Sequence, residues 1–321
     1  MKTTVTLDNG QTVTFDASIP TADDGLAFYL SQLSQTEAKI YEAKYRHIVY
    51  QDLVPVDMSA PEWVDSVSYI SYDAVTAGKF IGASGKDLPE TDINASKSVI
   101  NVFYGGNAYS YSLDELRKSQ AMNMPLDITK GRMSRRGFEE HAQKVAFFGD
   151  SDRGISGLFN GANVQLTNSL LDFNAATGQQ SVSYMNALLI NVWKNSAETH
   201  LANVFLIDSD NWSIISEKRM DSGTDTTVLE FFKKNNLYTA QTGLPLTVRA
   251  NFELKTAGVA NVPRMMAYEL NDDNLSMQMP MAWRPAPPQP DGLRVKIPAE
   301  YKFGGVEFRY PGCAAYHDNV A

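Results

Sequence analysis

The sequence is poor in the residues that most enzymes and metalloproteins use for chemistry. Its 321 residues include one cysteine, Cys313, and four histidines. A single cysteine excludes an intrachain disulfide and a metal site built from several thiolates. A chain without disulfides is typical of a reducing compartment, so we expect the protein to fold in a cytosol.

Long apolar runs are also absent. No stretch reaches the length of about 18 apolar residues that a membrane-spanning helix requires. The N-terminal segment MKTTVTLDNGQTVTF lacks the apolar core of a signal peptide. We therefore expect a soluble protein with no membrane partner and no export by a signal peptide.

An excess of positive charge is missing as well. The 28 basic and 37 acidic residues give a net charge of −9. This excludes a uniformly basic nucleic-acid-binding protein, although one local face could still contact nucleic acid. The hydrophobic fraction of 43% can form a substantial core, and the length suggests about two domains.

The first part of the chain predicts a hairpin, a helix and a long extended segment. Alternating apolar residues flank Asn9-Gly10, the preferred pair for a tight hairpin turn. A helical spacing follows from Leu26 past Ile40. From Trp63 to about Tyr111 the chain reads as two strands joined by the flexible tip GASGKDLPETD. Such an excursion has little core of its own, so we expect it to pack on something else.

The longest helical tract comes next. Ser112 and Glu115 form a predicted capping box for a helix over 113–122, and Pro125 breaks the tract. The tract resumes over 126–148, with Glu140 and Lys144 spaced as an outward-facing i,i+4 pair. Its expected apolar stripe is Phe138, Ala142, Val145 and Phe148 or Gly149. Gly149 is the expected C-cap.

Residues 166–284 predict a separate α/β unit. The expected elements are a helix through Met185 and Val192, a buried strand at Val204–Ile207, helices near 211–220 and 226–235, and strands with alternating apolar residues over 247–254 and 277–281. The proline-rich run RPAPPQP over 284–290 is expected to act as a connector. Two further strands are expected around 293–297 and 306–310.

Candidate catalytic and phosphate-binding motifs are incomplete. Glu139, Glu140 and His141 are adjacent, but neighbouring residues on a helix do not converge on one ion. The glycine-rich turn at 149–161 lacks the Gly-Lys-Ser/Thr ending of a nucleotide-phosphate loop. We therefore expect surface or intersubunit roles for the first group and a chain reversal for the second.

The other candidates favour structural roles. Cys313 and His317 lack an evident third partner, so a buried thiol is expected. Asp208-Ser-Asp210 and Asn271-Asp-Asp-Asn274 lack the full calcium-loop pattern, which leaves turns and helix caps. The methionines at 266, 277, 279 and 281 are expected in the core. No residue is assigned as catalytic, as a metal ligand or as binding a cofactor.

One basic cluster leaves two interpretations open. Lys130, Arg132, Arg135 and Arg136 lie close together in the long helical tract. They could face the interior of an assembly and contact phosphate, or they could pair with acids on neighbouring subunits.

Four stretches carry a resemblance to a known family. They are KDLPETDI in the extended segment, AYSYSLDELRKSQAMNMPLD before the long helix, VAFFGDSDRGISGLFN after it, and GGVEFRYPGCAAYHDNV near the C-terminus. In this order they resemble the major capsid protein of tailed bacteriophages, whose fold is shared with encapsulins. The resemblance covers the chain from about residue 20; the N-terminal hairpin has no counterpart in it.

The resemblance implies an α+β fold with five parts. These are an N-terminal arm with hairpin and helix (1–60), an extended two-stranded loop (61–111), a peripheral domain with a long spine helix (112–165), an axial domain (166–284), and C-terminal strands returning to the peripheral domain (285–321). It implies no enzymatic activity. The expected function is self-assembly, through pentamers and hexamers, into the icosahedral head of a virion formed in the host cytoplasm.

The expected partners follow from that role. They are copies of the same chain, packaged double-stranded DNA bound weakly and non-specifically, and portal, scaffold or decoration proteins. The residues expected to act in assembly are Lys86, Asp87, Arg132, Arg135, Arg136, Glu139 and Glu140. In some family members a loop lysine is crosslinked to a neighbour's asparagine, and Lys86 is near the expected loop tip.

Two alternatives remain from the sequence. One is an encapsulin-type compartment that encloses a cargo enzyme. The other is a soluble α/β enzyme, which predicts a small oligomer and a pocket with convergent polar groups.

Overall fold

The computed structural model describes residues 3–6, 12–15, 47–75, 92–122, 126–169, 172–221 and 223–319. The expected turn at Asn9-Gly10, the helix after Pro20, the break at Pro125 and the loop tip with Lys86 and Asp87 lie outside these residues. The chain divides into two units, 1–47 and 48–321. In the first, β1 (Thr3–Thr6) and β2 (Thr12–Phe15) pair antiparallel, with Val5 opposite Val13.

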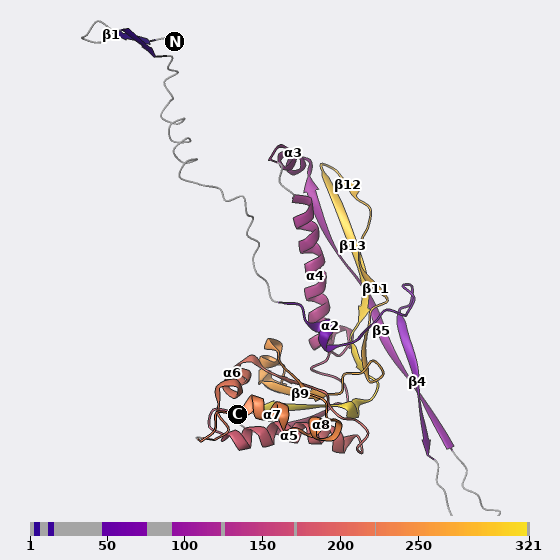
Figure 1. Ribbon diagram of the computed structural model, residues 1–321. Helices are drawn as coiled ribbons and strands as arrows, with labels where there is room; N and C mark the ends of the chain where they lie inside the picture. The colour runs from indigo at the N-terminus through magenta and orange to yellow at the C-terminus, as the bar shows by residue number, and fades with distance from the viewer. Residues whose placement is uncertain are drawn as a thin grey trace, which may run out of the picture. The chain divides into compact units, whose positions relative to one another are not determined.

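A long strand organises the extended part of the second unit. Strand β5 (Asp92–Ser112) pairs antiparallel with β4 (Ser66–Val75) along its first half and with β13 (Arg294–Gly304) along its second. Figure 1 shows β4 and the first half of β5 running out as a two-stranded extension. The two predicted strands of the excursion are therefore confirmed.

The spine helix lies against the second half of β5. A capping box starts α3 (Leu113–Met122): the Ser112 amide donates to Glu115 Oε2 (3.2 Å) and the Glu115 amide to Ser112 Oγ (3.1 Å), as predicted. Helix α4 (Leu126–Phe148) then packs on β5 (Figure 1). Phe138, Ala142 and Val145 are buried as expected. Phe147 is also buried and Phe148 only half-buried, so the apolar face is turned slightly from the predicted one.

The α/β unit is built on a mixed five-stranded sheet of order β6-β15-β9-β7-β8. Its strands are β6 (Gln165–Ser169), β7 (Val204–Ile207), β8 (Thr247–Ala250), β9 (Arg264–Tyr268) and β15 (Ala314–Asn319). Its helices are α5 (Gly178–Asn195), α6 (Ser209–Glu217), α7 (Val228–Lys234) and α8 (Leu237–Thr242). The predicted strand and three predicted helices are confirmed.

Both faces of this sheet are buried, in two separate apolar clusters. On β9, Met265 packs in a cluster with residues of α5 and α7, whereas Met266 packs in the cluster that also holds the end of α4. Strands covered on both faces read as continuous apolar runs rather than alternating ones. This is why Val204–Ile207 is apolar throughout.

A third, small sheet, of order β14-β10-β3, belongs to the same unit as the extended part and the α/β unit. Its strands are β3 (Val56–Asp57), β10 (Leu275–Gln278) and β14 (Val306–Phe308). The short helix α2 (Tyr50–Leu53) precedes it and is packed near α4. Among the described helices, none has both the length and the apolar character needed to cross a bilayer.

Two expected strands are corrected by the structure. The alternation over 247–254 is not one strand: β8 ends at Ala250, and Asn251 caps a 3-10 turn over Phe252–Thr256. Methionines 277, 279 and 281 are buried, but β10 ends at Gln278 and β11 (Met281–Pro285) begins at Met281.

The proline-rich run is not a connector between separate units. Both β11 and β12 (Gln289–Asp291) pair with β13, so the run lies within one antiparallel arrangement. The C-terminal segment, expected to return to the peripheral domain, contributes both to the extended part and to the α/β unit. Strand β13 pairs with β5, but β15 pairs with β6 and β9 of the α/β sheet, where its side chains are almost all buried.

Candidate functional site

The acidic cluster on α4 is divided among different partners. Glu139 accepts a hydrogen bond from Arg135 Nε (3.2 Å), and Glu140 accepts one from Arg136 Nε (2.8 Å). Both arginines lie one turn earlier on the same helix. The predicted pair of Glu140 with Lys144 is wrong, because Glu140 forms its ion pair with Arg136 in the preceding turn.

His141 points to a third partner. Its Nδ1 lies 2.9 Å from the Tyr301 hydroxyl on β13, and partial burial together with the charge of Arg153 lowers its pKa. Adjacent side chains diverge around a helix, so the two acids and the histidine do not converge. Among the described residues, no group of three acidic, histidine or cysteine side chains could hold a metal ion.

The basic cluster is largely occupied within the subunit. Lys130 forms a 2.9 Å ion pair with Glu115, donates to the Ser110 carbonyl (3.0 Å) and lies over the Tyr111 ring. Arg135 and Arg136 hold the acids described above, and Arg132 is exposed on the same helix. Lys130 therefore fastens the start of α4 to α3 and β5.

The glycine-rich turn uses its own amides for chain reversal. Gly149 has a φ of +66° and donates to Val145 O (2.8 Å), which confirms the predicted C-cap. Asp150 and Ile155 then exchange two backbone hydrogen bonds of 3.0 and 3.1 Å. The amides of Leu158 and Phe159 donate back to carbonyls of α4. These amides are not available to a phosphate.

The C-terminal thiol and imidazole are structural. Cys313 is fully buried, and burial raises the pKa of its thiol to about 12, so the nucleophilic thiolate does not form near neutral pH. His317 is also buried, and its ring lies 4.3 Å from that of Tyr184. Neither His317 nitrogen has a hydrogen-bond partner among the described residues. The expectation of a buried thiol is confirmed.

The two acidic motifs act as caps and turns, as expected. Asp208 accepts from the amides of Asp210 (3.1 Å) and Asn211 (3.0 Å) at the start of α6. Asn271 Oδ1 accepts from the Asp273 amide (3.2 Å) in a turn.

The extension carries an exposed apolar face that sequence reasoning did not single out. Ile70, Tyr72 and Val99 are 55%, 70% and 55% exposed. The register pairs Ser68 with Val99 and Ile70 with Lys97, which puts all three on one face. Ile100, on the opposite face, is buried. The signal was available, because the run VSYISY has large side chains at both odd and even positions, typical of a strand covered on both faces.

A second exposed cluster lies beside the base of the extension. Arg284 holds Glu300 (2.7 Å) and Glu62 (3.3 Å), and the Tyr104 hydroxyl donates to Glu300 (2.7 Å). Trp63 is 80% exposed nearby in the sequence. An exposed tryptophan with an arginine network is typical of protein interfaces.

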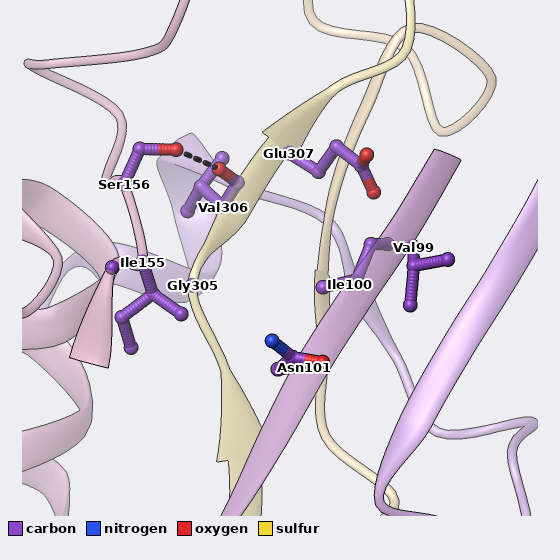
Figure 2. A pocket seen from close by; sticks show the side chains of 9 residues that line it. Val99, Ile100, Asn101, Ile155, Ser156, Gly305, Val306 and Glu307 are labelled. Atoms are coloured by element: carbon purple, nitrogen blue, oxygen red, sulfur yellow. Dashed lines mark hydrogen bonds between the residues drawn. The ribbon is translucent and has the colours of Figure 1, made fainter. Parts of the chain in front are cut away.

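A hollow of about 130 Å³ lies between the base of the extension and the small sheet (Figure 2). It is lined by Val99, Ile100, Asn101, Gly154, Ile155, Ser156, Gly305, Val306 and Glu307. Glu307 is its one ionisable lining residue among those described. Sites for small molecules are usually ~300–1,000 Å³ with several convergent polar groups, so this hollow does not resemble an enzyme pocket.

Comparison with known proteins gives a consistent result. A family model described as "Major capsid protein" matches residues 76–320. No curated protein matches the chain. Among solved structures, the capsid of Myoviridae phage XM1 aligns with a TM-score of 0.76 and 14% identity, covering 90% of this chain and 97% of that one.

Two other solved structures have the same fold. Gordonia phage Cozz aligns with a TM-score of 0.59 and 13% identity, covering 96% of this chain and 99% of that one. The capsid of an empty GTA particle aligns with a TM-score of 0.56 and 11% identity, covering 92% and 98%. At such identities the likeness shows a shared fold.

Proposed function

Because the chain belongs to the major capsid protein family of tailed phages, we propose that its subunits form the pentamers and hexamers of an icosahedral head around double-stranded DNA. Self-association into a shell follows from the family.

The apolar face of the extension is the observation that carries this proposal. A two-stranded ribbon with one face uncovered is marginal in water, and large exposed apolar side chains mark surfaces that bind partners. Ile70, Tyr72 and Val99 would therefore be covered by a neighbouring subunit. Lys86 and Asp87, which the sequence predicts near the tip of this loop, would contact the same neighbour.

We also propose which residues form each domain. Residues 1–60 would form the arm, 61–111 the loop over a neighbour, 112–165 with much of 285–321 the peripheral domain, and 166–284 the axial domain. The pairing of β13 with β5 supports the peripheral assignment. The place of β15 between β6 and β9 supports a C-terminal segment shared by both domains.

Contacts with DNA would be weak and non-specific. The net charge is −9, and Arg135 and Arg136 are paired with acids on their own helix. Few phosphate contacts mean little counterion release and low affinity. Contacts between the α4 helices of neighbouring subunits would instead involve the charged residues Arg132, Arg135, Arg136, Glu139 and Glu140. Shell strength would come from many modest contacts multiplied over a closed lattice, with no catalytic step.

Electron microscopy of the purified full chain tests this proposal. We expect closed icosahedral particles, and DNA inside those recovered from infected cells. Particles that enclose a protein cargo and no DNA would indicate an encapsulin-type compartment. A chain that stays monomeric under every assembly condition would contradict the shell.

A pair of double variants tests the surface. I70S/Y72S should abolish particles while leaving the unfolding midpoint of the subunit unchanged, because both side chains are solvent-exposed before assembly. I70V/Y72F keeps the apolar area and should assemble normally. Normal assembly of I70S/Y72S would place the contacts elsewhere.

A further inference from the structure

The small sheet β14-β10-β3 has two different faces. Leu275, Met277, Val306 and Phe308 point into the apolar core. The other face is polar, because Ser276 lies opposite Glu307 and Gln278 lies beside Asp57. Ser276 and Gln278 are only 2% and 1% exposed, so this polar face is covered.

The base of the extension supplies part of that cover. Val99, Ile100 and Asn101 of β5 line the hollow together with Glu307 of β14. Figure 2 shows the Glu307 side chain reaching from β14 toward Val99. Tyr69 of β4 is close enough for its hydroxyl to interact with Glu307. The extension therefore meets the body of the subunit across a polar surface and a hollow.

Hydrogen bonding at this surface is incomplete. Among the described residues, the buried atoms Glu307 Oε2 and Gln278 Oε1 have no hydrogen-bond donor. A buried acceptor without a donor is destabilising, and more so when it carries charge. The nearby cation, Arg309, donates its hydrogen bonds to Asp272 O (2.7 Å) and Ser276 Oγ (3.0 Å) and acts on Glu307 only through its charge.

We propose that Glu307 makes the base of the extension a proton-sensitive hinge. Uptake of one proton from solvent removes a partly buried negative charge and gives the carboxyl group an O–H donor. The base of the extension then closes on the small sheet. Loss of the proton restores the charge, and the base loosens so that water reaches it.

Burial of Glu307 outweighs the opposing effects of its neighbours and favours the protonated carboxyl group. Burial raises the pKa of its carboxyl group, while the Tyr69 hydroxyl and the charge of Arg309 act in the opposite direction. From β3, Asp57 faces the same surface, and hydrogen bonds from Ser59 hold its pKa below the usual value. From β5 the lining residues Val99, Ile100 and Asn101 carry no charge.

The linkage between protonation of Glu307 and closure sets the direction of the pH effect. A carboxyl group whose pKa is raised in the closed state favours closure at low pH. That preference is complete below its ordinary value of 4.5 and is lost as the pH rises through the raised value. A further consequence rests on the proposed shell: within it, the angle at which the extension meets a neighbouring subunit would depend on pH.

Hydrogen exchange on the unassembled full chain tests the hinge. After correction for intrinsic rates, amides of 66–72 and 97–103 should exchange more slowly at low pH (near 5) than at slightly alkaline pH, because protonation of Glu307 favours the closed base. E307Q, which is neutral and can donate, should exchange slowly at both pH values. E230Q, on the exposed side of α7, should behave as wild type.

Three results would overturn the hinge. They are a wild-type chain with no slowing at low pH, an E307Q chain that keeps the wild-type pH dependence, and a Y69F chain whose transition does not move to higher pH. The wild-type and Y69F measurements stand even where E307Q does not fold. Failure to form particles would contradict the shell but not the hinge, since exchange is measured on single subunits.

Discussion

Arg264 and Asp318 form a buried, two-pronged ion pair between the neighbouring strands β9 and β15. Arg264 Nε lies 2.6 Å from Asp318 Oδ1, and Nη2 lies 2.8 Å from Oδ2. The same carboxylate accepts from the Val259 amide (2.9 Å), and the guanidinium also donates to the Phe159 carbonyl. The pair thus links the α/β sheet to the turn that follows the spine helix.

Removal of one partner should be costly. R264L leaves a buried carboxylate without its cation, and such losses are typically ~3–5 kcal/mol. We expect a correspondingly lower free energy of unfolding in denaturant titrations. The double variant R264L/D318L should recover much of the loss, whereas K255A, which breaks the exposed Lys255–Asp210 pair, should have no measurable effect. Equal stability of R264L and wild type would contradict this.

Two glycines with the same backbone conformation should differ in their tolerance of alanine. Gly149 and Gly154 both have a φ of +66°. A Cβ at Gly149 would collide with the Ile155 carbonyl, whereas a Cβ at Gly154 meets nothing within 4 Å. We expect G154A to cost about 1–2 kcal/mol for the left-handed backbone alone. G149A should cost more than about 3 kcal/mol by thermal or chemical unfolding.

Acid should destabilise the α/β unit through His317. Burial lowers the pKa of this imidazole below 6.5, with the neighbouring Asp318 acting in the opposite direction. The stability that neutral His317 provides is therefore present above ~6.5 and is lost as the pH falls through that value toward the lowered one. Thermal midpoints measured from slightly alkaline to mildly acidic pH should fall for wild type and fall less for H317F. Parallel curves would show that His317 is not the titrating group.

Cys313 should be inert in the folded subunit. Burial, with a smaller contribution from the charge of Glu269, raises the pKa of its thiol to about 12. Labelling by a thiol reagent at mildly alkaline pH should require unfolding and should proceed rapidly in guanidinium chloride. Because Cys313 is the single cysteine, the readout is unambiguous. Fast labelling of the native subunit would contradict the buried position.

Local features were legible in the sequence because their causes lie within a few residues. The Ser112–Glu115 capping box, the Gly149 cap and the strand Val204–Ile207 depend on spacing, backbone freedom and a short apolar run. The two strands of the extension were legible for the same reason. The order of such motifs also carried the family resemblance, which the match over 76–320 confirms.

Tertiary structure alone decided which distant segments meet. The choice of Arg136 over Lys144 as partner of Glu140 depends on which side-chain directions the packed helix leaves open. The place of β15 beside β9, the pairing of Arg264 with Asp318 and the contact of the extension with Glu307 each join segments far apart in the chain. Helical period and strand alternation indicate only which residues of one element lie on the same face. The burial of a polar residue such as Gln278 depends on the surface that another element brings against it.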